Sequence, residues 1–449
     1  MALLENGSTE QLVWRLALPV LLEQMLIFGV GLFDTFLAGR ISTDATAAIG
    51  LAAYVGWLAS LLFSLAVTST TALVARHWGA GEEERANQFF NQSVPLAGLL
   101  GIIVWGLLYA AAPGFADLQN MTGETRLIVI RYLRIDAFGH VFTSLSLVGA
   151  AALRGTGDMR SPMLVLAVVN VINVIVSTAL VYGYGPLPRL GVDGIVAGTV
   201  VARICGGTLM LTVLAQGLSG LKLRRGAMRL RFEYVTKILR IGVPAAIDGC
   251  LTWIGQFLFM MIVARLAEGE LGRAIYAAHI IGIQVEGLTY LPATAWGRAA
   301  ATLVGQSLGA GDISRARRVG HVAVWQCSLL ACGASAAYYF GADAIFRLMH
   351  EDALVHEIGI PALRFLAFFQ VPLVLAIVYV YSLGGAGDTR YPMLISLCGI
   401  LLVRVPVAYL CGIVWQGGLI GAWTGMCADV ALRGVLAALR YSRGKWISL

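Results

Sequence analysis

Two carboxylates stand inside long apolar stretches of this sequence. Asp34 lies in LALPVLLEQMLIFGVGLFDTFLAGR, and Glu286 lies in an apolar stretch that runs from about residue 274 to residue 304. An acid at membrane depth costs a few kcal/mol even on lenient scales. Each acid is therefore a candidate for exchanging a proton or binding a cation, and the alternative for Asp34 is an acid that only serves helix packing.

Three neutral polar residues have the spacing to join Asp34. Asn173 and Ser177 are one turn apart on one expected helix, and Thr199 is about two turns into the next. All four groups would lie at similar depth in the N-terminal half. One carboxylate among neutral oxygens supports a single protonation switch and supplies little negative charge for a tight sodium site. For Ser177 alone, helix packing is an equally good interpretation.

A second group of residues surrounds Glu286 in the sequence and could line a substrate cleft. Tyr290 and Arg298 follow Glu286 on the same expected helix, and Phe257 and Met260 lie on the helix before it. A carboxylate in an aromatic-lined cleft can attract a lipophilic cation or bind a second proton. We also expect Pro292 to break the helix that carries Glu286.

Other ionisable residues in apolar stretches have open interpretations. Arg404 is in the middle of an expected helix and must find a partner, so a structural ion pair of Glu286 with Arg298 or Arg404 remains the alternative. Glu23 and Asp248 occupy matching positions in the two halves, which favours a gate or packing role. The seven Cys show no metal-ligand spacing, so we expect no metal site and no cofactor.

The elements that position these residues follow from the composition. Of 449 residues 58% are hydrophobic and only 13% are charged, with a mean hydropathy of +0.79. These values exclude a soluble enzyme, a disordered chain and a fibrous repeat, and they indicate an all-α polytopic membrane protein. Apolar stretches long enough to span a bilayer predict twelve helices at about 12–38, 47–75, 92–113, 126–151, 162–184, 192–216, 238–264, 274–304, 321–341, 360–383, 392–413 and 418–440.

The basic residues predict the orientation. One alternating set of loops, with the C-terminal tail, holds sixteen Lys and Arg residues, and the opposite set holds six. The basic set faces the cytoplasm by the positive-inside rule, so both termini are expected there, in a multi-pass protein of the cell (inner) membrane. The net charge of +7 is explained by this orientation and not by nucleic acid. Met1–Arg15 lacks a basic start, so we expect no signal peptide.

The sequence contains an internal duplication. Residues 155–163 (GTGDMRSPM) and 385–393 (GAGDTRYPM) are identical at six of nine positions, and residues 74–86 resemble 304–316 at the same offset. Each copy predicts a tight turn with glycines at positive φ and an Asp that caps the next helix. We therefore expect two six-helix lobes in a parallel repeat, 1–216 and 238–449, joined by a basic cytoplasmic linker at 217–237.

With these turns, the first helix and the stretch GVDGIVAGTV at 191–200, the whole chain resembles the multidrug and toxic compound extrusion (MATE) family. The resemblance implies a monomeric antiporter that exports amphipathic or cationic compounds across the lipid bilayer by alternating access. The coupling ion would be the proton, with sodium as the alternative. It also implies coupling positions at Asp34, Asn173, Ser177 and Thr199, although Ser177 stands where the family places a second acid. The alternatives are a lipid-linked saccharide flippase of the same superfamily and, less favoured, a membrane-embedded enzyme.

Overall fold

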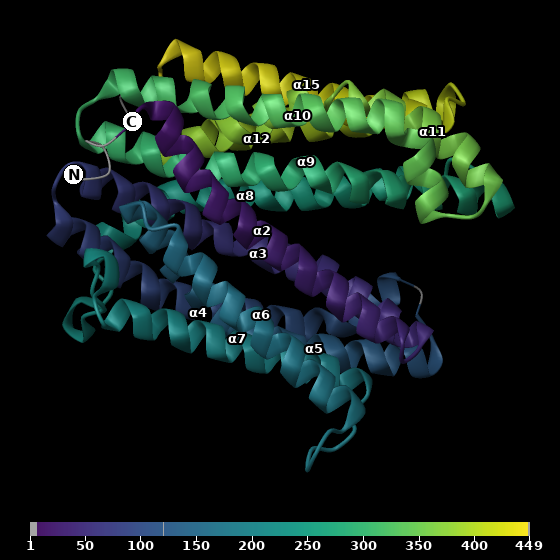
Figure 1. Cartoon of the computed structure of the whole chain (residues 1–449), viewed down its shortest axis with the longest axis horizontal. Helices are drawn as coiled ribbons and strands as arrows, with labels where there is room; N and C mark the ends of the chain where they lie inside the picture. The colour runs from purple at the N-terminus through teal and green to yellow at the C-terminus, as the bar shows by residue number, and fades with distance from the viewer. Residues whose placement is uncertain (1–6, 120, 448–449) are drawn as a thin grey trace. The chain divides into compact units, whose positions relative to one another are not determined.

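The computed structural model describes residues 7–119 and 121–447, and every regular element in that part of the chain is helical. The first six residues of Met1–Arg15 lie outside it. Figure 1 labels the longer helices. The bounds of the α-helices are α2 Thr9–Gly39, α3 Thr43–Gly79, α4 Glu83–Leu118, α5 Gly123–Thr156, α6 Arg160–Tyr182, α7 Val192–Ala215, α8 Phe232–Val263, α9 Gly269–Gly309, α10 Ile313–Met349, α11 Ala353–Ala367, α12 Gln370–Gly385, α13 Arg390–Cys398, α14 Val405–Tyr409 and α15 Gly418–Arg443.

Twelve helical segments correspond to the twelve predicted spans. Among the described residues, ten segments are long and apolar enough to cross a membrane, and the pair α11 and α12, bent by 54°, makes an eleventh. The twelfth segment is α9, a helix of 41 residues that carries Glu286. Pro292 was expected to break α9, but the helix continues through it. A proline removes one backbone N–H, and a helix within a membrane bundle can tolerate that loss.

The eleventh predicted helix departs from regular α-helix. Between α13 and α14 the chain forms a π-helical segment, Gly399–Arg404, and a second one, Leu410–Val414, follows α14. A π-helical turn widens the backbone and is frequent at functional sites. The first of these segments ends at Arg404, a residue that the sequence had already singled out.

Helix contacts divide the chain into two compact units. The N-terminal unit is Leu22–Ala246, and the C-terminal unit is Ile247–Leu449 together with Met1–Leu21. The two divisions therefore fall inside α2 and α8, each shortly after the proline of that helix, Pro19 or Pro244. The predicted lobe boundaries at residues 216 and 238 come from the sequence repeat. The compact units are defined by contacts and divide at other points, so they do not test these boundaries, which stay a prediction.

The basic stretch 217–237 is held firmly within the N-terminal unit by amide side chains of α4. The Asn91 side chain donates to the carbonyl of Lys222 at 3.0 Å and accepts from the N–H of Arg224 at 2.7 Å. The next residue, Gln92, makes three similar bonds to backbone groups further along the stretch, at 2.6 to 2.7 Å. Such bonds satisfy backbone groups that would otherwise need water. The stretch is thus bound along α4 and is not a free linker.

The duplicated turns have the predicted geometry at the last glycine of each copy but not at the first. Gly157 and Gly387 have φ values of 93° and 91°. Asp158 accepts hydrogen bonds from the backbone N–H groups of Arg160 and Ser161, each at 3.0 Å. Burial opposes ionisation of Asp158, but these and other hydrogen bonds outweigh burial and lower its pKa.

Gly155 was also expected at positive φ, and this expectation was wrong. The residue lies inside α5, and its φ is not positive. A Cβ at this position would lie 2.8 Å from the Val74 side chain of α3, so a glycine permits close packing of the two helices.

Candidate functional site

The predicted polar group around Asp34 assembles inside the N-terminal unit. The Thr199 hydroxyl on α7 lies 3.5 Å from Oδ2 of Asp34 on α2, and Nδ2 of Asn173 on α6 donates to that hydroxyl at 3.1 Å. Oδ1 of Asp34 and Oδ1 of Asn173 are both buried without a hydrogen-bond partner. The site therefore holds more acceptors than donors, an imbalance that a proton or a cation would relieve.

Ser177 lies beside this group but does not contact the carboxylate. Its hydroxyl donates to the carbonyl of Ile195 on α7 at 3.4 Å, and the residue is fully buried. Gly198 packs directly against Ser177, because any Cβ there would overlap the serine. Ser177 thus serves the contact between α6 and α7, which was the packing interpretation of this residue.

A second polar group in the same unit contains a residue that the sequence analysis missed. Nη1 of Arg203, one turn beyond Thr199 on α7, lies 3.0 Å from Oδ1 of Asp136 on α5. Nε2 of His140 lies 3.2 Å from Oδ2 of the same carboxylate. Asp136 and His140 are almost completely buried. The signal for Arg203 was available, since an arginine that follows Thr199 by four residues must share its helix face.

The two polar groups of the N-terminal unit act on each other electrostatically. The charges of both Arg203 and Asp136 reach the carboxylate of Asp34. Two carboxylates and one guanidinium leave this part of the unit with one negative charge in excess when His140 is neutral. One proton would cancel that excess.

The C-terminal unit buries its charges in pairs. Arg404 contacts Oδ2 of Asp429 on α15 through Nη2 at 2.8 Å and Nε at 2.9 Å, and Arg433 contacts the other carboxylate oxygen at 2.9 Å. Nη1 of Arg404 also donates to the Gln256 side chain at 3.4 Å. Asp429 is completely buried. Arg404 therefore finds its partner in Asp429, a residue that the sequence analysis did not single out.

Glu286 remains outside these pairs. The salt bridges of the described residues include none of Glu286, while the charge of Arg404 acts on its carboxylate. The alternative of a structural pair with Arg298 or Arg404 therefore stays a prediction. Tyr290, one turn further along α9, is 47% exposed. An unpaired carboxylate beside an accessible aromatic ring can hold an organic cation.

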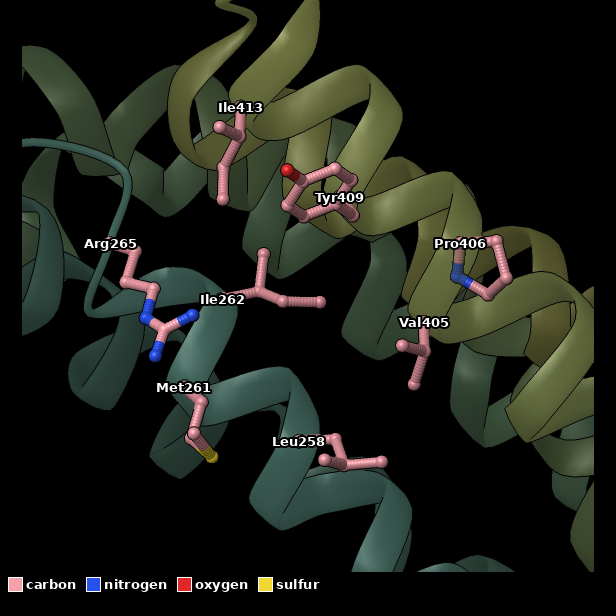
Figure 2. Close-up of a pocket in the computed structure, with 8 residues that line it drawn as sticks. All are labelled: Leu258, Met261, Ile262, Arg265, Val405, Pro406, Tyr409 and Ile413. Carbon is pink, nitrogen blue, oxygen red and sulfur yellow. The ribbon is translucent and has the colours of Figure 1, made fainter.

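The other predicted cleft residues lie on α8. Phe257 stacks on Trp253 with ring centroids 5.9 Å apart and planes inclined by 4°, and Met260 is half-buried. A groove of about 350 Å³ lies between the end of α8 and the stretch from α14 onward, and Figure 2 draws the side chains that line it. It is lined by Leu258, Met261, Ile262, Arg265, Val405, Pro406, Tyr409 and Ile413. The predicted cleft residues do not line this groove.

The matched acids Glu23 and Asp248 differ in their contacts. Both oxygens of Glu23 on α2 accept from Nη1 of Arg154 on α5 at 3.2 Å, and both residues are buried. Asp248 on α8 accepts from Ser396, while its Oδ1 is buried without a partner. Glu23 therefore ties two helices of the N-terminal unit together. Among the described residues, no three His, Cys, Asp or Glu side chains gather into a metal-binding group.

Comparison with known sequences gives one family and several close relatives. A family model described as MatE matches residues 19–178 and 244–410. The chain is 30% identical over 433 residues to the probable multidrug resistance protein NorM of Thermotoga maritima, covering 96% of this chain and 92% of that protein. It is 24% identical over 434 residues to the multidrug resistance protein MdtK of Pectobacterium atrosepticum, covering 95% and 93%.

Comparison with solved structures shows the same fold. An outward-facing multidrug resistance MATE family transporter of the MOP superfamily matches with a TM-score of 0.88 and 20% identity, over 97% of both chains. A MOP superfamily transporter from Pyrococcus furiosus matches with a TM-score of 0.89 and 20% identity, over 98% of this chain and 96% of that one. These likenesses confirm the predicted fold class, an all-α polytopic membrane protein with twelve helices in two six-helix halves.

Proposed function

We propose a mechanism for this chain from one premise: the chain belongs to the MatE family. It is a multi-pass membrane efflux transporter and not an enzyme, and members of its family handle small-molecule drugs. This membership favours drug efflux over the flippase alternative. The finer proposal is that the chain exchanges amphipathic or cationic compounds for protons by alternating access.

The observation that carries the proposal is the Asp34 carboxylate, which makes no ion pair among the described residues. Its Oδ1 is buried without a hydrogen-bond partner, and Oδ2 contacts the Thr199 hydroxyl, to which Asn173 donates. A protonated carboxyl gains a donor in a site where acceptors exceed donors, so proton binding removes a desolvation cost. Proton uptake at Asp34 then changes how strongly α2 is held by α7, and this change is the step that we couple to alternating access.

Sodium is the second candidate for the coupling ion. The two unpartnered oxygens, Oδ1 of Asp34 and Oδ1 of Asn173, are of the type that binds hard cations, and the Thr199 hydroxyl could add a third ligand. Only one of these groups is charged. Ser177 adds no charge and its hydroxyl donates to a backbone carbonyl instead. A site with one carboxylate favours the proton.

We assign Glu286 to substrate attraction. Its carboxylate makes no ion pair among the described residues, and the exposed ring of Tyr290 lies one turn away on α9. A lipophilic cation would gain both a charge contact and an aromatic face at this place.

The test of the coupling proposal separates the two ions. Purified protein in proteoliposomes is given a proton gradient or a sodium gradient, and transport of ethidium is followed by fluorescence. We expect transport with the proton gradient, and we expect Asp34→Asn to abolish it. The matched control is Asp117→Asn, the same change at an exposed acid paired with Arg126. Full activity of Asp34→Asn would contradict the role of Asp34, and transport with sodium alone would replace the proton as the coupling ion.

We also propose that the chain works as a monomer in the inner membrane with both termini in the cytoplasm. The support is the basic stretch 217–237, whose five Lys and Arg residues between 222 and 231 would face the cytoplasm. Trypsin should cleave this stretch in inside-out vesicles and spare it in right-side-out cells. Cleavage from the outside would reverse the orientation.

A further inference from the structure

We propose that His140 is a second proton-binding residue of the N-terminal unit and shares with Asp34 the proton that neutralises their buried surroundings. This inference rests on the proposed proton coupling and deepens it. It depends on the contacts of His140, Asp136 and Arg203 and on the charge that these groups leave uncompensated.

The tautomer of His140 follows from its partner. Asp136 is held by the Arg203 guanidinium at 3.0 Å, so its carboxylate is ionised and can only accept hydrogen bonds. Both ring nitrogens of His140 are buried without a hydrogen bond of good geometry, and Nε2 meets the Asp136 carboxylate only as a close contact at 3.2 Å. A hydrogen on Nε2 faces this carboxylate favourably, which leaves the lone pair of Nδ1 as the basic position.

Besides Asp136 and Arg203, the His140 ring has neighbours that are uncharged. From α3, a Cβ added at Gly56 would lie 3.7 Å from Cε1 of the ring, and Phe63 has its ring centroid 6.2 Å away. The described charges that act on the ring are those of Asp136, on its own helix, and Arg203 on α7. Asp136 stabilises an imidazolium at His140, and Arg203 opposes it, so the balance depends on further negative charge nearby.

Asp34 is the other acid of this group of charges. Arg203 links Asp34 with the Asp136–His140 pair: its guanidinium pairs with Asp136, and its charge also acts on Asp34. With both acids ionised, one added proton brings the set to neutrality whether it binds Asp34 or His140. A second proton would leave a buried positive charge, which is costly. We therefore infer that Asp34, Asp136, Arg203 and His140 together exchange one proton, which either Asp34 or His140 can hold.

Close packing keeps the arrangement in place. A Cβ at position 139 would lie 2.9 Å from Cδ of Arg203, so Gly139 makes room for the arginine to cross α5 and reach Asp136. The guanidinium also donates from Nη1 to the backbone carbonyl of Asp136 at 3.2 Å. These contacts fix Arg203 beside Asp136, one helical turn from the Thr199 that contacts Asp34.

The chain contains its own comparison residue. His279 in the C-terminal unit is also buried, but its Nδ1 accepts from Nε1 of Trp423 at 3.1 Å. A proton on that nitrogen would have to break the bond. His279 should therefore stay neutral under conditions in which His140 gains a proton.

The test is nitrogen NMR of histidine side chains in protein labelled with 15N-histidine and held in lipid nanodiscs. The chain has six His, and His140→Gln and His279→Gln assign the two signals. Between about pH 5 and 9, we expect His140 to pass from the neutral ring with hydrogen on Nε2 to the imidazolium, while His279 stays neutral. In Asp34→Asn, less imidazolium should form at any given pH. A His140 signal that stays neutral throughout, or a titration that Asp34→Asn leaves unchanged, would overturn the proposal.

A transport measurement gives a second readout and separates the two proposals. In proteoliposomes, His140→Gln should still exchange ethidium for protons, because Asp34 remains, but its dependence on pH should differ from that of the wild type. A wild-type pH profile in His140→Gln overturns the proposal. If the wild type exports no ethidium under a proton gradient, the proposed function fails, and the NMR titration still decides the role of His140.

Discussion

Each compact unit holds one acid, Asp34 or Asp429, whose contacts differ in kind. In the N-terminal unit, α6 and α7 present Asn173 and Thr199 to Asp34, and the contacts are hydrogen bonds between neutral groups and one carboxylate. In the C-terminal unit, the segment that ends at Arg404 and α15 with Asp429 form a buried ion pair. The first arrangement can gain or lose a proton at modest cost, whereas the second is held by opposite charges. Under the proposed mechanism, the carboxylate of Asp34 would exchange an ion, whereas the Arg404–Asp429 pair would brace the C-terminal unit.

The largest effect on stability is expected for Asp429→Asn. This change leaves the buried Arg404 and the half-buried Arg433 without their carboxylate. Removing one partner of a buried pair costs about 3–5 kcal/mol, so much of the protein should be lost on extraction. Thermal unfolding of the purified protein measures the change, with Asp34→Asn as the matched control. Equal stability of the two variants would remove the contrast between the units.

Glu286→Gln tests whether the C-terminal unit also carries a free charge for substrate. The carboxylate has no ion-pair partner among the described residues, so its loss should leave stability nearly unchanged. We expect binding of tetraphenylphosphonium to weaken by about tenfold, which corresponds to ~1.4 kcal/mol. Titration calorimetry measures the affinity, and an uncharged compound of similar size is the control. An equal loss for both compounds would point to a change of shape instead of charge.

The duplicated turns allow a smaller comparison of the same kind. Asp388 in the C-terminal unit pairs with Arg440 at 2.8 Å, while Asp158 in the N-terminal unit accepts only from neutral groups. Asp388→Ala should cost about 2 kcal/mol, since it removes hydrogen bonds to a charged group. Asp158→Ala should cost about 1 kcal/mol, as loss of a helix cap does. A larger loss of stability for Asp158→Ala than for Asp388→Ala in thermal unfolding would contradict this comparison.

The smallest effect is the pH dependence of the turn at Asp158. Because hydrogen bonds lower the pKa of Asp158 in the folded protein, its contribution to stability is fully present above the unfolded value, near pH ~4. That contribution is lost as the pH falls through the lowered pKa. The difference in melting temperature between wild type and Asp158→Ala should thus shrink between about pH 7 and pH 3. A constant difference would show that the charge of Asp158 is not involved.

The sequence predicted one unit better than the other for a physical reason. Asp34, Asn173 and Thr199 are isolated polar residues in apolar helices, so their spacing alone was enough to bring them together. Arg404 was recognised as needing a partner, but Asp429 was not chosen because several acids could have satisfied it. The place of Arg203 on the Thr199 face of its helix could have been predicted, but its partner Asp136 could not, because only the packing of α5 on α7 joins residues 67 positions apart.

The fold shows the same limit. Twelve helices and the duplicated turns were predicted from local apolar length and glycine spacing, and both are confirmed. The continuity of α9 through Pro292 and the bend between α11 and α12 depend on how neighbouring helices pack. Local sequence does not contain that information.

The most direct test of the central claim is to count the protons released when substrate binds. Tetraphenylphosphonium is added to the purified protein in weakly buffered detergent solution, and a pH-sensitive dye reports the protons set free. If Asp34 provides the exchangeable charge, the wild type should release about one proton for each cation bound, and Asp34→Asn should bind the cation while releasing none. Release of as many protons by Asp34→Asn as by the wild type would contradict the account.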